Sequence, residues 1–83
     1  MKSLIEDIIR NTEKIIGPVA LVQASKVKGI KIVNMIRITG NPKRIIRDIV
    51  KRYKGIIGPV ALRIAEKAAE KSPEKISIKS LIK

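Results

Sequence analysis

A six-residue motif that occurs twice constrains the fold of this chain more than any other feature. Residues 16–21 (Ile-Gly-Pro-Val-Ala-Leu) recur at 57–62, an offset of 41 residues. Flanking residues keep this offset, because 4–9 aligns with 45–50 and Ala24 aligns with Ala65. Repetition at a fixed spacing indicates a repeated structural unit. We therefore expect one domain, residues 1–83, with an internal repeat at 2–28 and 43–71.

Each repeat has the pattern of two helices joined at Gly-Pro. Before each motif, apolar residues recur at the spacing of a helix with one buried face. Asn41 and Pro42 suit the start of the second such helix. Glycine can end a helix in the left-handed conformation, and proline suits the first turn of the next. The second helices are expected at about 19–27 and 60–71. The predicted fold is mainly α, with two helix–Gly-Pro–helix repeats packed in one small domain.

Two segments allow more than one interpretation. Residues 29–40 are rich in β-branched residues, which favours a β-strand at about 30–39, with a short helix as the alternative. Residues 74–82 stay open, because Ser72-Pro73 resembles a helix start whereas 75–79 alternates like a strand. A strand ahead of two helices also allows an α+β alternative. This is a ribbon-helix-helix-like dimer in which residues 31–39 form the ribbon.

Composition excludes several classes of function. The chain of 83 residues has no Cys and no His, so it lacks the usual zinc ligands and the Cys–His or Ser–His pairs of nucleophilic catalysis. Its 7 acidic residues show no pairing with a base. We expect no catalytic residues, no metal, no cofactor and no enzymatic activity.

No apolar run reaches the roughly 20 residues of a transmembrane helix, which predicts a cytoplasmic protein. The small size favours a homodimer, and the Ile- and Lys-rich composition suggests a thermophile.

The positive charge is concentrated in the middle of the chain. The whole sequence carries 19 Lys and Arg and a net charge of +12, of which residues 26–54 hold +9 and residues 1–25 hold none. Opposite the apolar stripe of the helix after Asn41, a basic ridge is expected to neutralise phosphates. The predicted nucleic-acid-binding residues on this helix face are Lys43, Arg44, Arg47, Lys51, Arg52 and Lys54. Lys31 and Arg37, on the possible ribbon, are predicted to bind as well.

This ridge predicts a small basic protein that binds nucleic acid, most simply duplex DNA through its backbone, in a chromatin-associated or regulatory role. Tyr53, the one aromatic residue, lies in the apolar stripe, which argues against base stacking. Two docking modes are open: a helix-turn-helix with residues 60–71 in the groove, or the ribbon at 31–39. Alternative explanations of the charge are a solvated surface, an anionic membrane or an acidic protein partner. DNA versus RNA, sequence preference and oligomeric state stay open.

The corner itself resembles a short helical module. An Ile-Gly-Pro-Val-Ala string between two amphipathic helices resembles a module at the ends of bacterial signalling proteins and of some archaeal small-GTPase-regulator-like proteins. Residues 45–71 carry the better match, through Tyr53, the corner at 57–61 and the Ala-rich run 65–69, and residues 4–24 match less closely. The resemblance implies a regulatory or interaction role without catalytic residues. It supports a second hypothesis, a non-catalytic protein-interaction or oligomerisation module.

Overall fold

The predicted mainly α fold with two helix–Gly-Pro–helix repeats is confirmed. A computed structural model describes residues 2–73 and 76–81, which form helices and one small antiparallel sheet. The elements are α1 (Lys2–Ile16), α2 (Val19–Ser25), β1 (Ile30–Ile32), β2 (Ile36–Ile38), α3 (Pro42–Ile57), α4 (Val60–Lys71) and α5 (Ile78–Leu81). Helix α2 ends two residues before the predicted boundary at 27.

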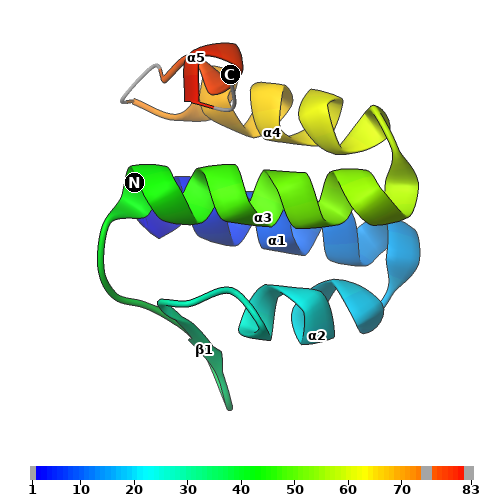
Figure 1. The fold of residues 1–83 in the computed structure, drawn as a ribbon, viewed down its shortest axis with the longest axis vertical. Coiled ribbons are helices and arrows are strands. Elements are labelled where there is room, and N and C mark those ends of the chain that lie inside the picture. Colours follow the sequence, from blue (N-terminus) through cyan, green and yellow to red (C-terminus); the bar gives the residue numbers. More distant parts are fainter. Residues whose placement is uncertain (1, 74–75, 82–83) are drawn as a thin grey trace.

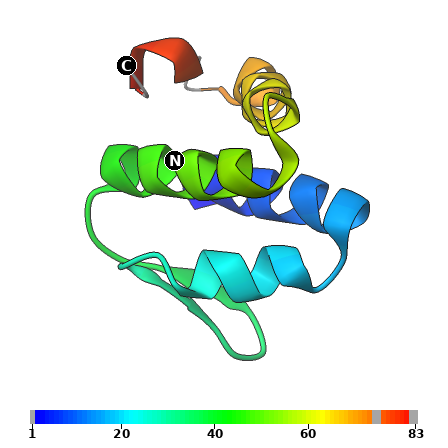
Figure 2. The same cartoon turned by 45° about the vertical axis from the view of Figure 1, so that its right-hand side comes forward.

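The two repeats pack as two helical hairpins around a shared centre. Helices α1 and α3 run side by side in the same direction, with α2 on one side of them and α4 on the other (Figures 1 and 2). Both α1 and α3 contact both α2 and α4. Each hairpin is therefore related to the other by a rotation about an axis along the helices. As a result, both Gly-Pro corners lie at the same end of the molecule.

The core is built mainly from equivalent positions of the two repeats. The apolar stripes of α1 and α3 supply eight side chains that are each at most 1% exposed: Leu4, Ile5, Ile8, Ile9, Ile45, Ile46, Ile49 and Val50. Burying a side chain of this size stabilises the fold by about 1.5–3 kcal/mol. The second helices contribute small buried residues, Ala20, Ala24, Ala61 and Ala65, which allow close packing between helices.

Thr12 and Tyr53 occupy equivalent places in the two repeats, but they make different bonds. Thr12 donates a hydrogen bond from Oγ1 to the Ile8 carbonyl of its own helix at 2.8 Å. Tyr53 is fully buried and donates from its hydroxyl to the carbonyl of Ala20, in the other repeat, at 2.6 Å. Burial raises the pKa of the Tyr53 phenol far above its usual value, and the negative charge of Glu13 adds to this effect. Tyr53 thus belongs to the predicted apolar stripe and links the two hairpins.

The helix boundaries follow the predicted local signals. Gly17 and Gly58 both adopt left-handed φ angles, 70° and 69°, that other residues rarely adopt. Their N–H groups donate to carbonyls of the preceding helix turn, at 2.7 and 2.9 Å. At the start of α3, the Asn41 side chain accepts hydrogen bonds from the backbone N–H groups of Lys43 and Arg44.

The predicted strand at 30–39 is a β-hairpin rather than one strand. Strands β1 and β2 pair antiparallel, with Ile30 opposite Ile38 and Ile32 opposite Ile36. The chain reverses at residues 33–35, so the second strand satisfies the backbone groups of the first. In the ribbon-helix-helix alternative, two chains would supply the ribbon. Here a single chain supplies both of its strands.

The C-terminal segment forms a short helix where the sequence left strand and helix open. Helix α5 buries Ile78 and contacts α3 and α4. Ser72 ends α4 instead of starting a new helix. Residues 74, 75 and 82, which the sequence also left open, lie outside the described residues.

Candidate nucleic-acid interface

Four of the predicted binding residues form an exposed stripe along α3, which we call the ridge: Lys43, Arg47, Lys51 and Lys54. Spacings of four, four and three residues place them on one face of a helix, and the opposite face of α3 is buried in the core. Within residues 2–73 and 76–81, no hydrogen bond or ion pair involves these four side chains. The ridge therefore presents four positive charges that no acidic side chain of residues 2–73 or 76–81 pairs with.

Arg44, also predicted to bind, lies beside the ridge and is bonded to the protein itself. Its guanidinium donates to the Asp48 carboxylate at 2.8 Å and to the carbonyl of Lys28 at 2.9 Å. The bond to the Lys28 carbonyl connects α3 to the loop between α2 and β1. The bond to Asp48 stays within α3 and neutralises the one acidic residue of this helix. Arg44 is thus a positioning residue, whereas the ridge side chains form no such bonds within the described residues.

Arg52 lies away from the ridge, on the side of α3 that faces α2. Its Nη1 donates to the Gln23 side chain at 2.9 Å, which holds the guanidinium over the edge of α2. This position places Arg52 at the rim of a surface groove. The groove has a volume of about 540 Å³ and is lined by Lys26, Val27, Lys28, Asp48, Lys51, Arg52 and Gly55.

This groove, which we call the basic groove, extends the ridge onto a second part of the chain. Four cations line it, and its only carboxylate is paired with Arg44. Lys51 belongs to both the ridge and the groove. Lys26 and Lys28 lie in the predicted basic segment but not among the predicted site residues, because their approach to α3 depends on how α2 packs. Their place in the charged segment 26–54 is the only sequence signal that points to them.

Lys31 and Arg37 lie on the β-hairpin, apart from the ridge. They are cross-strand partners and both are exposed, whereas Ile30, Ile36 and Ile38 are buried on the other face. Like charges directly opposite each other destabilise a sheet. Neither side chain is paired with an acid among the described residues. The eight predicted residues therefore fall into a ridge, a groove rim, the positioning residue Arg44 and a hairpin pair.

The first repeat carries no such surface. Positions of α1 equivalent to the ridge hold Lys2, Glu6, Arg10 and Glu13, a mixture of signs. Arg10 and Glu13 form an ion pair at 3.3 Å. Because the two helices share a packing role and differ in their exposed faces, the charge of α3 is not a requirement of the fold.

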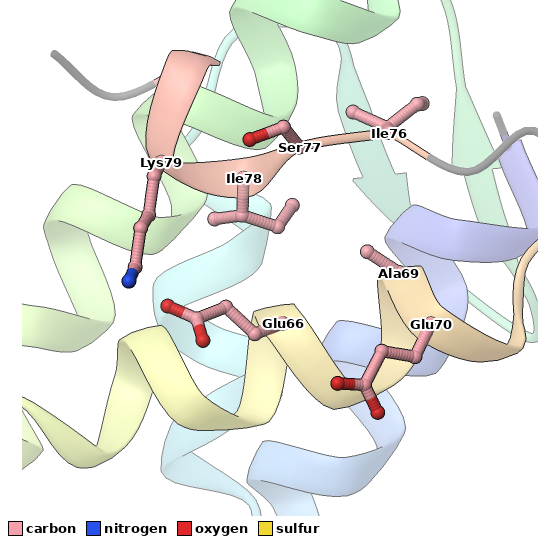
Figure 3. A pocket seen from close by; sticks show the side chains of 7 residues that line it. All are labelled: Glu66, Ala69, Glu70, Ile76, Ser77, Ile78 and Lys79. Carbon is pink, nitrogen blue, oxygen red and sulfur yellow. The ribbon is translucent and has the colours of Figure 1, made fainter.

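A second hollow lies between α4 and α5 and differs in character (Figure 3). It has a volume of about 490 Å³ and is lined by Glu66, Ala69, Glu70, Ile76, Ser77, Ile78 and Lys79. The two glutamates come from α4, and the chain before and within α5 covers the hollow from the other side. An anionic backbone would be repelled by these glutamates, so this hollow is no extension of the basic groove.

Among the residues described, no cluster of acidic side chains could hold a metal ion, and no helix is long and apolar enough to cross a membrane. No family model matches the chain, and neither the curated proteins nor the solved structures yield a match.

Proposed function

We propose that this protein binds duplex nucleic acid, DNA in the first place, through the phosphate backbone and without catalysing a reaction. The observation that carries this proposal is the ridge, whose four cations have no counterion within the described residues. The basic groove adds Lys26, Lys28 and Arg52 beside it. With such a surface, we assign to this protein a chromatin-associated or regulatory role in the cytoplasm.

The dimensions of the ridge suit a duplex backbone. At about 1.5 Å per residue, the segment from Lys43 to Lys54 is roughly 16 Å long. With both strands counted, a duplex carries one negative charge per about 1.7 Å, so this length of duplex holds on the order of ten phosphates, more than the four cations of the ridge. Tyr53 is buried in the core, which removes the one aromatic ring of the chain from base stacking. Backbone contact is therefore favoured over recognition of single strands.

Neutralising the ridge tests this function. In K43Q/R47Q/K51Q, the affinity for a short fluorescent DNA duplex is expected to fall on the order of 100-fold near physiological salt, because three phosphate contacts are lost. The slope of log K against log salt, measured by titration between about 50 and 300 mM salt, is expected to become shallower by about 3.

A matched control is available on α4. Arg63, Lys67 and Lys71 are exposed and have the same four-residue spacing as Lys43, Arg47 and Lys51. R63Q/K67Q/K71Q removes the same total charge and is expected to change affinity much less. Equal losses in the two variants would show a non-specific response to net charge. No salt-dependent binding of the natural chain would refute the proposal.

A separate observation favours the second candidate, an oligomerisation module. Four branched apolar side chains near the Gly-Pro corners are exposed at the same end of the molecule: Ile15, Val19, Ile56 and Val60. An apolar surface is complementary to itself, as a symmetric dimer requires, and the resemblance of the corner to an interaction module agrees with this candidate. It predicts a dimer by light scattering that I15S/I56S converts to a monomer. A natural chain that is monomeric would refute it.

A further inference from the structure

The tip of the β-hairpin exposes two apolar side chains that are separated in sequence by one polar residue. Val33 is 84% exposed and Met35 is 59% exposed, the highest values among the large apolar residues of the described chain. The turn is tight, because the N–H of Val33 donates to the Met35 carbonyl at 3.4 Å and Ile32 pairs with Ile36 directly behind it. The tip is therefore a compact apolar projection in water.

Next to this tip, the outer face of the ribbon is cationic. Lys31 and Arg37 lie opposite each other, one residue behind the pair that closes the turn. Neither has an anionic partner in the described structure, although their mutual repulsion disfavours the pairing. A polyanion that contacts both side chains would relieve this repulsion. Charge complementarity thus indicates which kind of partner meets the apolar tip.

The base of the hairpin packs against α2 and is tied to α3 by a side-chain hydrogen bond. Arg44 bonds the carbonyl of Lys28, two residues before β1. Thr39, just after β2, donates its N–H to the Gly29 carbonyl at 2.8 Å. Ile30, Ile36 and Ile38 are buried against the helices. A side chain that separates stacked base pairs works against a few kcal/mol per step, so it requires such a fixed support.

We propose that the hairpin enters the minor groove of the duplex and that Val33 and Met35 insert between base pairs, while Lys31 and Arg37 contact the flanking phosphates. This inference rests on the proposed binding of duplex nucleic acid and adds a deformation of the bound duplex. Two-stranded ribbons bind DNA in the minor groove as well as the major groove, and apolar side chains inserted from the minor groove kink DNA. The basic groove lies between α3 and the residues that precede this ribbon, Lys26 and Lys28, so its charges lie near the base of the ribbon.

The test uses a duplex that carries the fluorescent base 2-aminopurine, whose emission rises when it is unstacked. Saturating natural protein is expected to raise this emission and to bind a duplex with a central mismatch more tightly than a fully paired one. In V33S/M35S, the emission change is expected to disappear, and the affinity for paired duplex to fall at least about 10-fold, since buried apolar contact is lost. The salt slope is expected to stay unchanged, because the phosphate contacts remain.

The matched control is V22S, which replaces another exposed valine, on α2, and is expected to leave emission and affinity unchanged. Helical circular dichroism reports whether each variant is folded. Salt-dependent binding by the natural chain without an emission change, or an unaltered change in V33S/M35S, overturns the wedge while the ridge function stands. A third outcome also overturns the wedge. If the natural chain binds phosphatidylserine vesicles and V33S/M35S does not, while both bind duplex equally well, the tip inserts into lipid. A natural chain that binds no duplex refutes both proposals.

Discussion

Replacing Tyr53 by alanine is expected to remove a large part of the folding stability of this protein. The change deletes a fully buried ring and the hydroxyl that bonds Ala20 of the other repeat. Truncating a large buried aromatic costs about 3–5 kcal/mol. A domain of 83 residues has a free energy of unfolding on the order of 4–12 kcal/mol. Urea unfolding followed by circular dichroism at the helix band measures the loss.

Tyr53→Phe separates the ring from its hydroxyl. It keeps the packing and is expected to lower the free energy of unfolding by about 1–2 kcal/mol, because the Ala20 carbonyl loses a donor. The raised pKa of the Tyr53 phenol adds a pH dependence. Above the usual phenol pKa of 10.0, the unfolded chain releases this proton before the folded one, so stability falls as pH rises. Tyr53→Phe lacks this contribution. An unchanged urea midpoint in Tyr53→Ala would contradict the proposed link between the hairpins.

Gly29→Ala is expected to destabilise the hairpin base strongly. Gly29 has a φ of +101°, which an alanine adopts only with strain of about 1–3 kcal/mol. An added Cβ would also overlap the Thr39 carbonyl oxygen and lie 2.9 Å from Cδ1 of Ile45. Overpacking of this kind costs a further 1–3 kcal/mol or so. We therefore expect a loss of about 3 kcal/mol or more in urea unfolding, together with weaker binding of duplex DNA.

Gly55→Ala is the matched control, with an effect of opposite sign. Gly55 lies inside α3, and a Cβ added there would meet no atom within 4 Å. Replacing a helical glycine by alanine stabilises a helix by about 1 kcal/mol. The same substitution should therefore lower the urea midpoint at position 29 and raise it at position 55. Equal effects at the two sites would show that close approach at the hairpin base is not what requires Gly29.

Much of the fold could be predicted because its signals are local. The apolar stripe of α3, the cap at Asn41 and the corner glycines each depend on residues within a few positions along the chain. The burial of Tyr53 followed from the same stripe. The hairpin was harder to predict, because whether 30–39 runs straight or reverses depends on what its Ile face meets, and here that face packs against the helices.

The candidate site was predicted only in part. Lys43, Arg47, Lys51 and Lys54 share a face by helical spacing alone. Tertiary packing decided the rest. It turned Arg44 toward the Lys28 carbonyl, drew Arg52 to Gln23, and brought Lys26 and Lys28 alongside Lys51.

By itself, the sequence determined the two repeated helical hairpins, their buried faces and the excess charge on the second. Apolar periodicity, helix caps and the positions of charged residues each depend on a few neighbouring residues, so they can be recognised in the sequence alone. Only the tertiary structure decided that a basic groove adjoins the ridge. It also decided that β1 and β2 form a hairpin that projects from the helices (Figure 1), with exposed apolar side chains at its tip. These features join segments that are distant along the chain, and the packing of α2, β1 and β2 against the helical core sets their distances.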